Sequence, residues 1–589
     1  MTEALTSDNL LHFNGIDGDT GDYALPPMPP ADLARLIRGE ARLENLSELC
    51  DKERNKDPKH LGVRKGIDPK NLAETGWGIV FPQDADPAIR EALSPLLALR
   101  EGQAGERFRI YAGEDGYQTG ETKSHWLARR PRKMGPGQTD PRRVPYYLLI
   151  CASPEEVPDR FQSQLDVQYA VGRIHFDDLD GYANYARSVV EAETGGLRLP
   201  RRMEVFGVAN PMDQATLLSA KHLVAPVRDE LAEDFADWSF TASMRERATK
   251  ARLAELLGGA DTPALLFTAS HGMGFGPDSK RQLPHQGALL CQDWPGPGMH
   301  QGPIPQDCYF AGDDLGADAN LLGLIAFFFA CYGAGTPELD EFAQQAFQQP
   351  SRISPHPFMA RLPMQMLARP RGGALAVIGH VDRAWSYSFR WPGAGRQTGV
   401  FRDAFHRLLA GHPVGSAMEP FGARYAELST LLSDDLQQAD RGRSLEPRDL
   451  AGKWTANNDA RGYALIGDPA VRLPVAAPAD QPQGREALQL QPASQDTGDA
   501  AATPGTDAGT LSNCTSEVTE DGSCLTIETY VSAGADPASK RLLAVCTRVA
   551  ADGNIITDVG EQFANHAAVL RLHAELVKLS LARHSQANV

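Results

Sequence analysis

The 589-residue chain has no apolar run long enough to cross a membrane. A membrane helix needs about 18 or more consecutive apolar residues, whereas the longest apolar run here, "LIAFFFACYG" at residues 324–333, has the length of a strand. The first residues, "MTEALTSDNLLHFNGIDGD", carry acids and lack the basic start and apolar stretch of a signal peptide. We therefore expect a cytoplasmic protein without a membrane-spanning part.

The chain also lacks an excess of positive charge. It has 58 Lys and Arg residues against 76 Asp and Glu, a formal net charge of -18. Binding to a polyphosphate depends on clustered basic side chains that neutralise it. The balance therefore argues against nucleic acid and anionic membranes as partners.

The cysteines lack a pairing pattern. There are eight of them, scattered along the chain and without a Cys-x-x-Cys pair. A disulfide framework or a structural zinc site would need regular, close spacings. We expect neither a metal nor an organic cofactor, and each cysteine has to be judged singly.

What the chain does have, from about residue 144, is a regular alternation of strand and helix patterns. Helical patterns such as "DGYANYARSVVEAE" separate short, nearly continuous apolar runs that end in small or polar residues: "VPYYLLICAS", "MEVFGVAN", "ALLFTASHG", "LIAFFFACYG" and "ALAVIGHVD". Continuous rather than alternating apolar strands indicate a mostly parallel sheet covered on both faces. The sequence thus predicts a three-layer α/β fold, in which chemistry gathers beyond the carboxyl ends of the strands.

A chain of this length is too long to fold around a single hydrophobic core, and its composition divides it into four regions. Residues 1–135 are irregular and predict an N-terminal accessory region, and residues 136–475 carry the α/β pattern. Residues 476–515 are rich in Ala, Pro, Gln, Gly and Asp, which predicts a disordered linker. Residues 516–589 predict a small β-β-β-α unit. A basic stretch at residues 128–143, rich in Gly and Pro, predicts an exposed loop open to proteolysis.

Two of the predicted strands end in reactive side chains. "ALLFTASHG" places His271 before Gly272, and "LIAFFFACYG" places Cys331 shortly before Gly333. If the two strands are parallel neighbours, both side chains emerge at one edge of the sheet, where an imidazole can activate a thiol or protonate a leaving amine. The glycines would let the backbone approach a substrate and leave N–H groups free for an oxyanion. The sequence thus predicts a cysteine–histidine dyad.

A structural interpretation competes with this one. A single cysteine at a strand end is most often a small buried side chain, and a single histidine beside glycine is usually a loop residue. The shared context of the two favours the functional interpretation. Cys291 and Cys308 lack a following glycine turn and are expected to be structural, while His380, at the end of "ALAVIGH", is a rival histidine.

The order apolar run–His–Gly and then apolar run–Ala–Cys resembles the clan CD cysteine peptidases, among them caspases, metacaspases, legumain, separase, gingipains and bacterial CHAT proteins. Caspases carry Gln-Ala-Cys-x-Gly with the histidine about fifty residues upstream. Here Phe329 stands in place of the glutamine, and His271 lies further upstream. The chain therefore looks more similar to gingipain-like and CHAT proteins than to caspases.

Three flanking segments add to the resemblance. "YAVGRIHFDDLDGYANYARSVV" is similar to the Val-Gly-Arg segment before the catalytic subdomain of gingipains. "GGALAVIGHVDRAWSYSF" resembles the later strand whose loop carries an aromatic residue into the first specificity pocket, and "NNDARGYALIGDPAVRLP" resembles the closing Gly-Asp-Pro-Ala segment. The resemblance covers roughly residues 144–475 and implies a caspase-like (caspase-hemoglobinase) fold.

The resemblance also implies roles. His271 would be the general acid or base and Cys331 the nucleophile, with the backbone N–H groups of Gly272 and Cys331 holding the oxyanion. It further implies an acid that either orients the histidine or binds a basic substrate side chain, and Asp213 stands at a suitable place before His271. The competing interpretation of Asp213 is a helix N-cap ahead of "QATLLSAKHLV".

Weaker candidates complete the set. By resemblance Trp385 would flank the specificity pocket, although it could equally be an ordinary partly buried aromatic residue. Asp382 and Asp293 are further acids with a weaker case.

The implied function is a bacterial cytoplasmic cysteine endopeptidase that cleaves protein substrates after Arg or Lys. One version of it is a regulated zymogen of a stress or defence pathway, activated by cleavage within residues 128–143. The alternative is a catalytically silent scaffold, whose linker and C-terminal unit dock a regulatory partner. Retention of both His271 and Cys331 favours the enzyme.

Overall fold

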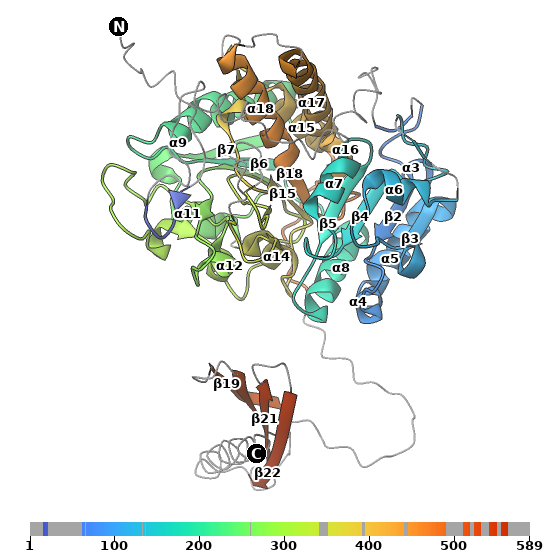
Figure 1. The fold of residues 1–589 in the computed structure, drawn as a ribbon, viewed down its shortest axis with the longest axis vertical. Coiled ribbons are helices and arrows are strands. Elements are labelled where there is room, and N and C mark those ends of the chain that lie inside the picture. The colour runs from blue at the N-terminus through green and yellow to red at the C-terminus, as the bar shows by residue number, and fades with distance from the viewer. Residues whose placement is uncertain are drawn as a thin grey trace. The chain divides into compact units, whose positions relative to one another are not determined.

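The computed structural model divides the chain into two compact units, residues 1–490 and 491–589 (Figure 1). The structure describes residues 16–21, 62–64, 66–131, 134–135, 137–258, 261–340, 352–391, 395–440 and 446–489, together with four strands between residues 510 and 563. Across these residues, no helix has the length and apolar character that a membrane span requires.

A ten-stranded sheet forms the centre of the first unit, in the order β3-β2-β4-β5-β18-β15-β12-β8-β6-β7. Its strands are β2 (Trp77–Val80), β3 (Phe108–Tyr111), β4 (Tyr147–Cys151), β5 (Ala170–Ile174), β6 (Arg202–Gly207), β7 (Ser239–Met244), β8 (Leu265–Ala269), β12 (Ile325–Phe329), β15 (Ala376–His380) and β18 (Tyr463–Gly467). The pairing of β15 with β18 is antiparallel, whereas the pairings from β15 through β12, β8 and β6 to β7 are parallel. The predicted α/β class with a mostly parallel sheet is confirmed.

Helices flank this sheet (Figure 1). One group that packs together comprises α4 (Pro87–Ala92), α5 (Ser94–Ala104), α8 (Leu179–Thr194) and α14 (Arg361–Leu367). A second group comprises α10 (Ala225–Asp234), α15 (Gly399–Leu409), α16 (Val414–Ala417) and α17 (Glu419–Asp440), and α17 pairs with α18 (Pro447–Gly462). Strands β4, β5, β8, β12, β15 and β18 are buried at every position, which explains their continuous apolar runs.

Aromatic rings hold the middle of the sheet. Phe327 on β12 lies 5.6 Å from the ring of Phe267 on β8 and 5.4 Å from that of Phe405 on α15. Such edge-to-face and tilted contacts stabilise a core beyond the burial of their area. They tie β12 and β8 to the helix above them.

The N-terminal region is not a separate accessory unit, which corrects the predicted boundary at residue 135. Strand β2 pairs in parallel with β4 over four residues and with β3 on its other side, so both strands extend the central sheet. The run "GWGIVF" is recognisable as a strand, but its pairing partner lies some seventy residues further along the chain. The local sequence pattern indicates that a strand is present but not which distant strand it pairs with.

A buried charge network joins this N-terminal region to the end of β18. Asp468 Oδ2 accepts from Arg100 Nε at 2.6 Å, and its Oδ1 accepts from Trp77 Nε1 at 2.9 Å. Arg100 also binds Glu193 through both terminal nitrogens, at 2.8 and 2.7 Å. The Arg100 and Asp468 side chains are 1% and 0% exposed. The Gly-Asp-Pro segment therefore has a structural role in this chain.

The predicted linker is also partly wrong. Residues 476–489 pack along the first unit through main-chain hydrogen bonds from Ala476 N to Leu199 O at 2.9 Å and from Leu488 N to Arg371 O at 3.0 Å. Composition alone suggested disorder, but these hydrogen bonds satisfy the polar backbone at the surface of the unit.

The second unit contains a four-stranded antiparallel sheet in the order β19-β20-β21-β22. Its strands are β19 (Thr510–Val518), β20 (Cys524–Val531), β21 (Arg541–Val549) and β22 (Ile555–Phe563). The sequence predicted three strands from residue 516, whereas β19 begins within the predicted linker. Its polar composition, "TLSNCTSEV", concealed it. The predicted C-terminal helix lies outside the described residues.

The basic segment 128–143 is exposed only in part. Arg130 is 3% exposed, and its guanidinium lies 4.4 Å from the ring centroid of Trp126. The side chains of Arg142 and Arg143 are 62% and 46% exposed. Within the described portion of this segment, the accessible basic side chains are therefore at its end.

We expect Asp468→Ala to destabilise the first unit by about 3–5 kcal/mol, because it leaves the Arg100 charge buried with one partner fewer. Asp480→Ala is the matched control, since Asp480 pairs with Arg198 at the surface and should cost about 1 kcal/mol or less. The measurement is the urea midpoint followed by tryptophan fluorescence. Equal midpoints for the two variants would contradict the structural role of Asp468.

Candidate active site

The pairing of β8 with β12 places His271 and Cys331 at one edge of the sheet. Five residue pairs link the strands in parallel, ending with Ala269 opposite Phe329, and Ser270 N continues the ladder by donating to Phe329 O at 3.2 Å. His271 and Cys331 each stand two residues beyond the last pair. The structure thus brings together the two residues that the sequence singled out.

A tight turn carries the thiol. Gly333 N donates to Ala330 O at 3.4 Å, and Tyr332 N donates to Asp382 O at 2.7 Å. The residue of this turn in the left-handed region is Tyr332, at φ 58, and not Gly333. A bulky residue in this region is strained and persists only where its surroundings hold it.

Gly272 is required because there is no space for a side chain at this position. A Cβ atom at Gly272 would lie 1.8 Å from Cys331 O, and one at Gly287 would lie 2.1 Å from Tyr332 O. The main chain after His271 therefore packs directly against the main chain of the cysteine turn. Only glycine fits these two positions.

Asp213 contacts the histidine. His271 Nε2 lies 2.8 Å from Asp213 Oδ2, and both side chains are 0% exposed. Because an ionised carboxylate only accepts hydrogen bonds, His271 Nε2–H is the donor in this contact. Asp213 is also the N-cap of α9 (Gln214–Ser219), since it accepts from the backbone N–H groups of Ala215 and Thr216. Asp213 is thus the N-cap of α9, and the same carboxylate contacts His271, while a catalytic role for it stays a prediction.

Two residues that sequence reasoning missed support this arrangement. The ring of Trp294 lies 6.4 Å from that of His271, nearly perpendicular to it. Asn210 Nδ2 donates to Trp294 O at 2.7 Å and so fixes the loop that carries the tryptophan to the end of β6. No motif marks either residue, because their role depends on loops that meet only in the fold.

The thiol is covered. Cys331 is 0% exposed, and its Sγ accepts from Ala384 N at 3.3 Å. Burial raises the pKa of the Cys331 thiol well above its usual value, while the hydrogen bond from Ala384 opposes the rise. A buried thiol has to lose its proton to a nearby base before it can act as a nucleophile.

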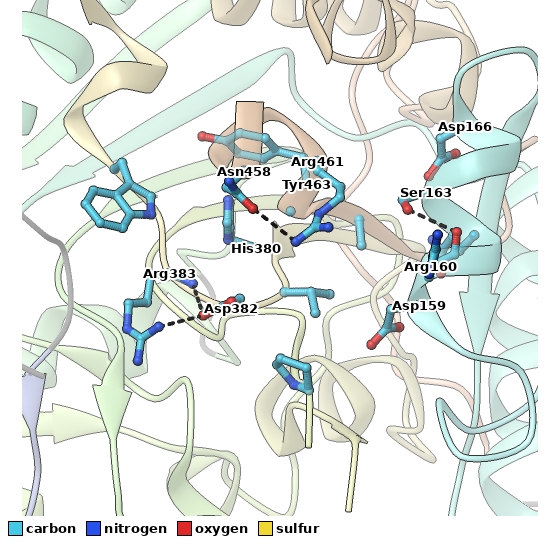
Figure 2. A pocket seen from close by; sticks show the side chains of 16 residues that line it. Asp159, Arg160, Ser163, Asp166, His380, Asp382, Arg383, Asn458, Arg461 and Tyr463 are labelled. Atoms are coloured by element: carbon cyan, nitrogen blue, oxygen red, sulfur yellow. Dashed lines mark hydrogen bonds and ion pairs between the residues drawn. The ribbon is translucent and has the colours of Figure 1, made fainter. Parts of the chain in front are cut away.

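A cleft of about 60 Å³ lies between α7 (Asp159–Asp166), the end of β15 and the end of α18 (Figure 2). Trp385 and Asp382 line it, and Asp382 is left-handed at φ 78. The described lining residues include neither His271 nor Cys331. The cleft is therefore separated from the sulfur by the loop that follows β15.

The remaining candidates have other partners. His380, at the end of β15, is 1% exposed, and its Nε2 donates to Asp459 O at 2.8 Å. Strand β15 lies next to β12 in the sheet. Asp293 accepts from Lys250 N at 2.7 Å, at the start of α11 (Lys250–Leu256). Cys291 is fully buried and Cys308 nearly so. Among the residues that the structure describes, no group of three or more His, Cys, Asp or Glu side chains is placed to hold a metal ion.

Comparison with known proteins gives limited similarity. No protein-family description and no curated protein matches the sequence. One similar solved structure is the complex of Porphyromonas gingivalis RgpB pro- and mature domains, with 11% identity, 82% of this chain and 99% of that chain covered, and a TM-score of 0.36. Another, named "Structure of Protease", has 10% identity, covers 83% and 97% of the two chains, and has a TM-score of 0.36. Both neighbours are proteases, and similarity at this level assigns no activity to the chain.

We expect Gly272→Ala to destabilise the protein by about 1–3 kcal/mol, because the added methyl group overlaps Cys331 O. Gly276→Ala is the matched control, since a Cβ atom there meets nothing within 4 Å. The shift of the thermal unfolding midpoint measures the difference. A midpoint for Gly272→Ala equal to that of Gly276→Ala would show that the two main chains are not in contact.

Proposed function

We propose that this protein is a caspase-like cysteine endopeptidase. The observation that carries the proposal is the parallel register of β8 and β12, which sets His271 and Cys331 side by side at the sheet edge. Cys331 Sγ attacks the scissile carbonyl, and the N–H groups of Gly272 and Cys331 stabilise the oxyanion. His271 takes the thiol proton and delivers it to the leaving amine, and water then hydrolyses the thioester.

Asp213 supports this mechanism as the residue that orients the histidine. Its carboxylate holds Nε2, so the imidazole keeps one tautomer and one rotation. A buried carboxylate beside the ring also stabilises the imidazolium that forms during proton transfer. No metal or organic cofactor enters the reaction.

The proposed substrates are proteins, cleaved after Arg or Lys. Because Asp213 faces His271, a different acid has to receive the basic side chain. The cleft beside Trp385 is lined by three acids, Asp159, Asp166 and Asp382, and by three arginines, Arg160, Arg383 and Arg461, so its charges do not decide the preference. A peptide panel distinguishes this preference from others.

The covered site supports a regulated enzyme. His271, Asp213 and Cys331 are all 0% exposed, so a substrate cannot reach the sulfur without movement of the neighbouring loops. The same burial favours a second candidate function, a catalytically silent scaffold. The setting that we propose is the cytoplasm of a bacterium, in a stress or defence pathway, with the C-terminal unit docking a regulatory partner.

We expect the activated protein to hydrolyse fluorogenic peptides with Arg or Lys before the scissile bond, and Cys331→Ala to abolish turnover because it removes the nucleophile. Cys308→Ala is the control, since Cys308 immediately precedes β11 (Tyr309–Phe310), which is outside the ten-stranded sheet. Asp213→Asn should keep the fold and lower kcat by about 10²-fold or more, because the neutral amide no longer stabilises the imidazolium and its NH₂ group can hold the histidine in the other tautomer.

Equal turnover by the wild type and Cys331→Ala would overturn the peptidase assignment. A thiol-reactive peptidyl probe separates the two candidate functions. Failure to label Cys331 in any activated state would favour the scaffold.

We expect the intact chain to have low basal turnover and to gain activity after cleavage at Arg142 or Arg143, the exposed basic side chains in the described part of the 128–143 segment. Limited trypsin digestion followed by the peptide assay measures this gain. The Arg142→Gln/Arg143→Gln variant should resist activation. An intact chain that is already fully active would contradict regulation by cleavage.

A further inference from the structure

The loop after β15 separates the thiol from α18. We call residues 381–388 the flanking segment. On one side, Ala384 N donates to Cys331 Sγ at 3.3 Å and Asp382 O accepts from Tyr332 N at 2.7 Å. The position of this segment therefore determines both the cover over the sulfur and the hydrogen bond to it.

On its other side, one carboxylate holds the segment. Asp459 on α18 accepts from Trp385 N at 2.8 Å through Oδ1 and from Ser388 Oγ at 2.5 Å through Oδ2. Its main-chain oxygen accepts from His380 Nε2 at 2.8 Å. Asp459 thus binds the flanking segment at two points and the strand before it at a third.

Burying this carboxylate is unfavourable by itself. Asp459 is 0% exposed, and burial raises its pKa. Its nearest basic nitrogen among the ion pairs is His380 Nε2, 3.8 Å from Oδ1, and burial lowers the pKa of that histidine. Apolar residues often replace buried ionic groups without loss of stability. A buried acid that contacts the backbone beside a reactive thiol is better explained by the position it imposes.

The segment it holds is strained and has room to move. Asp382 at φ 78 and Tyr332 at φ 58 are left-handed, and the hydrogen bond from Tyr332 N to Asp382 O joins them. Such conformations need external restraint. Asp382, Arg383 and Trp385 also line the cleft of about 60 Å³, so a small space lies beside the segment (Figure 2).

We propose that Asp459 is a positioning residue of the Cys331 site, which holds the Trp385 main chain so that Ala384 N–H stays directed at the sulfur. Its effect on turnover rests on the proposed peptidase function, whereas its effect on the cover over the thiol does not. Asp459 acts through the flanking segment and does not touch a substrate.

The test compares Asp459→Ala with Asp459→Asn and Ser388→Ala in the full-length protein. Asp459→Ala removes both carboxylate oxygens, and Asp459→Asn keeps one oxygen that can accept from Trp385 N. Ser388→Ala removes only the hydrogen bond at residue 388. Iodoacetamide alkylation of each cysteine is followed by peptide mass spectrometry at neutral pH. Cys151 and Cys291 are internal controls, because both are free and buried and belong to other elements: Cys151 ends β4, and Cys291 follows β10 (Leu289–Leu290).

We expect Asp459→Ala to raise the alkylation rate of Cys331 by about tenfold or more, with Cys151 and Cys291 unchanged, and to lower kcat by about tenfold or more at similar KM, since a small misplacement of a reacting group is costly. Asp459→Asn and Ser388→Ala should stay within about threefold of the wild type, because the acceptor for Trp385 N remains.

An unchanged alkylation rate of Cys331 in folded Asp459→Ala would overturn the proposal. So would an equal rise in the alkylation rates of Cys331, Cys151 and Cys291, because it would indicate that the whole protein is destabilised. If Asp459→Ala does not fold, the test passes to folded Asp459→Asn. A Cys331 alkylation rate in that variant as high as in denatured protein overturns the proposal. Retention of the wild-type alkylation rate supports it. A wild type without peptidase activity, combined with a Cys331-specific rise, would refute the enzyme and leave the positioning role.

Discussion

The parallel pairing of β8 with β12 is the constraint on which the candidate site depends. Five paired residues set the two strands in register, so whatever follows each strand emerges at the same level of the same edge. Phe267 and Phe327, one on each strand, interlock beneath α15 and hold that register. A slip of one residue would turn every side chain of β12 to the other face and separate the histidine from the cysteine.

The elements around this edge restrain it at close range. Gly272 and Gly287 allow two main chains to pack against the cysteine turn, and the left-handed Tyr332 completes that turn at a cost in backbone strain. Asp213 fixes the histidine from the side of β6, and Asp459 fixes the flanking segment from the side of β18. Two buried carboxylates, one on each side, thus act on the same site through different partners.

The sequence predicted what local pattern encodes. Continuous apolar runs reported the buried strands, and the side chains that ended two of them marked the His271 and Cys331 pair. Asp213 was recognisable because it follows a strand and precedes a helix. Asp459 was not, because it lies inside α18 without a motif and meets Trp385 only through tertiary packing. The same reason hid the pairing of β2 with β4, the contact between Trp294 and His271, and the packing of residues 476–489 on the first unit.

The buried charges around Asp468 have a consequence for how the chain behaves after it is cut. Strands β2 and β3 sit in the sheet next to β4, and Arg100 and Trp77 bind the aspartate that follows β18. A break at residue 142 or 143 therefore leaves the N-terminal fragment in place, because its departure would expose the edge of β4 and strip a buried aspartate of its cation. The two fragments of a cleaved molecule then stay associated, and their complex has nearly the mass of the intact protein in solution. Any change in its activity has to arise from relaxation near the break and not from the loss of a covering domain.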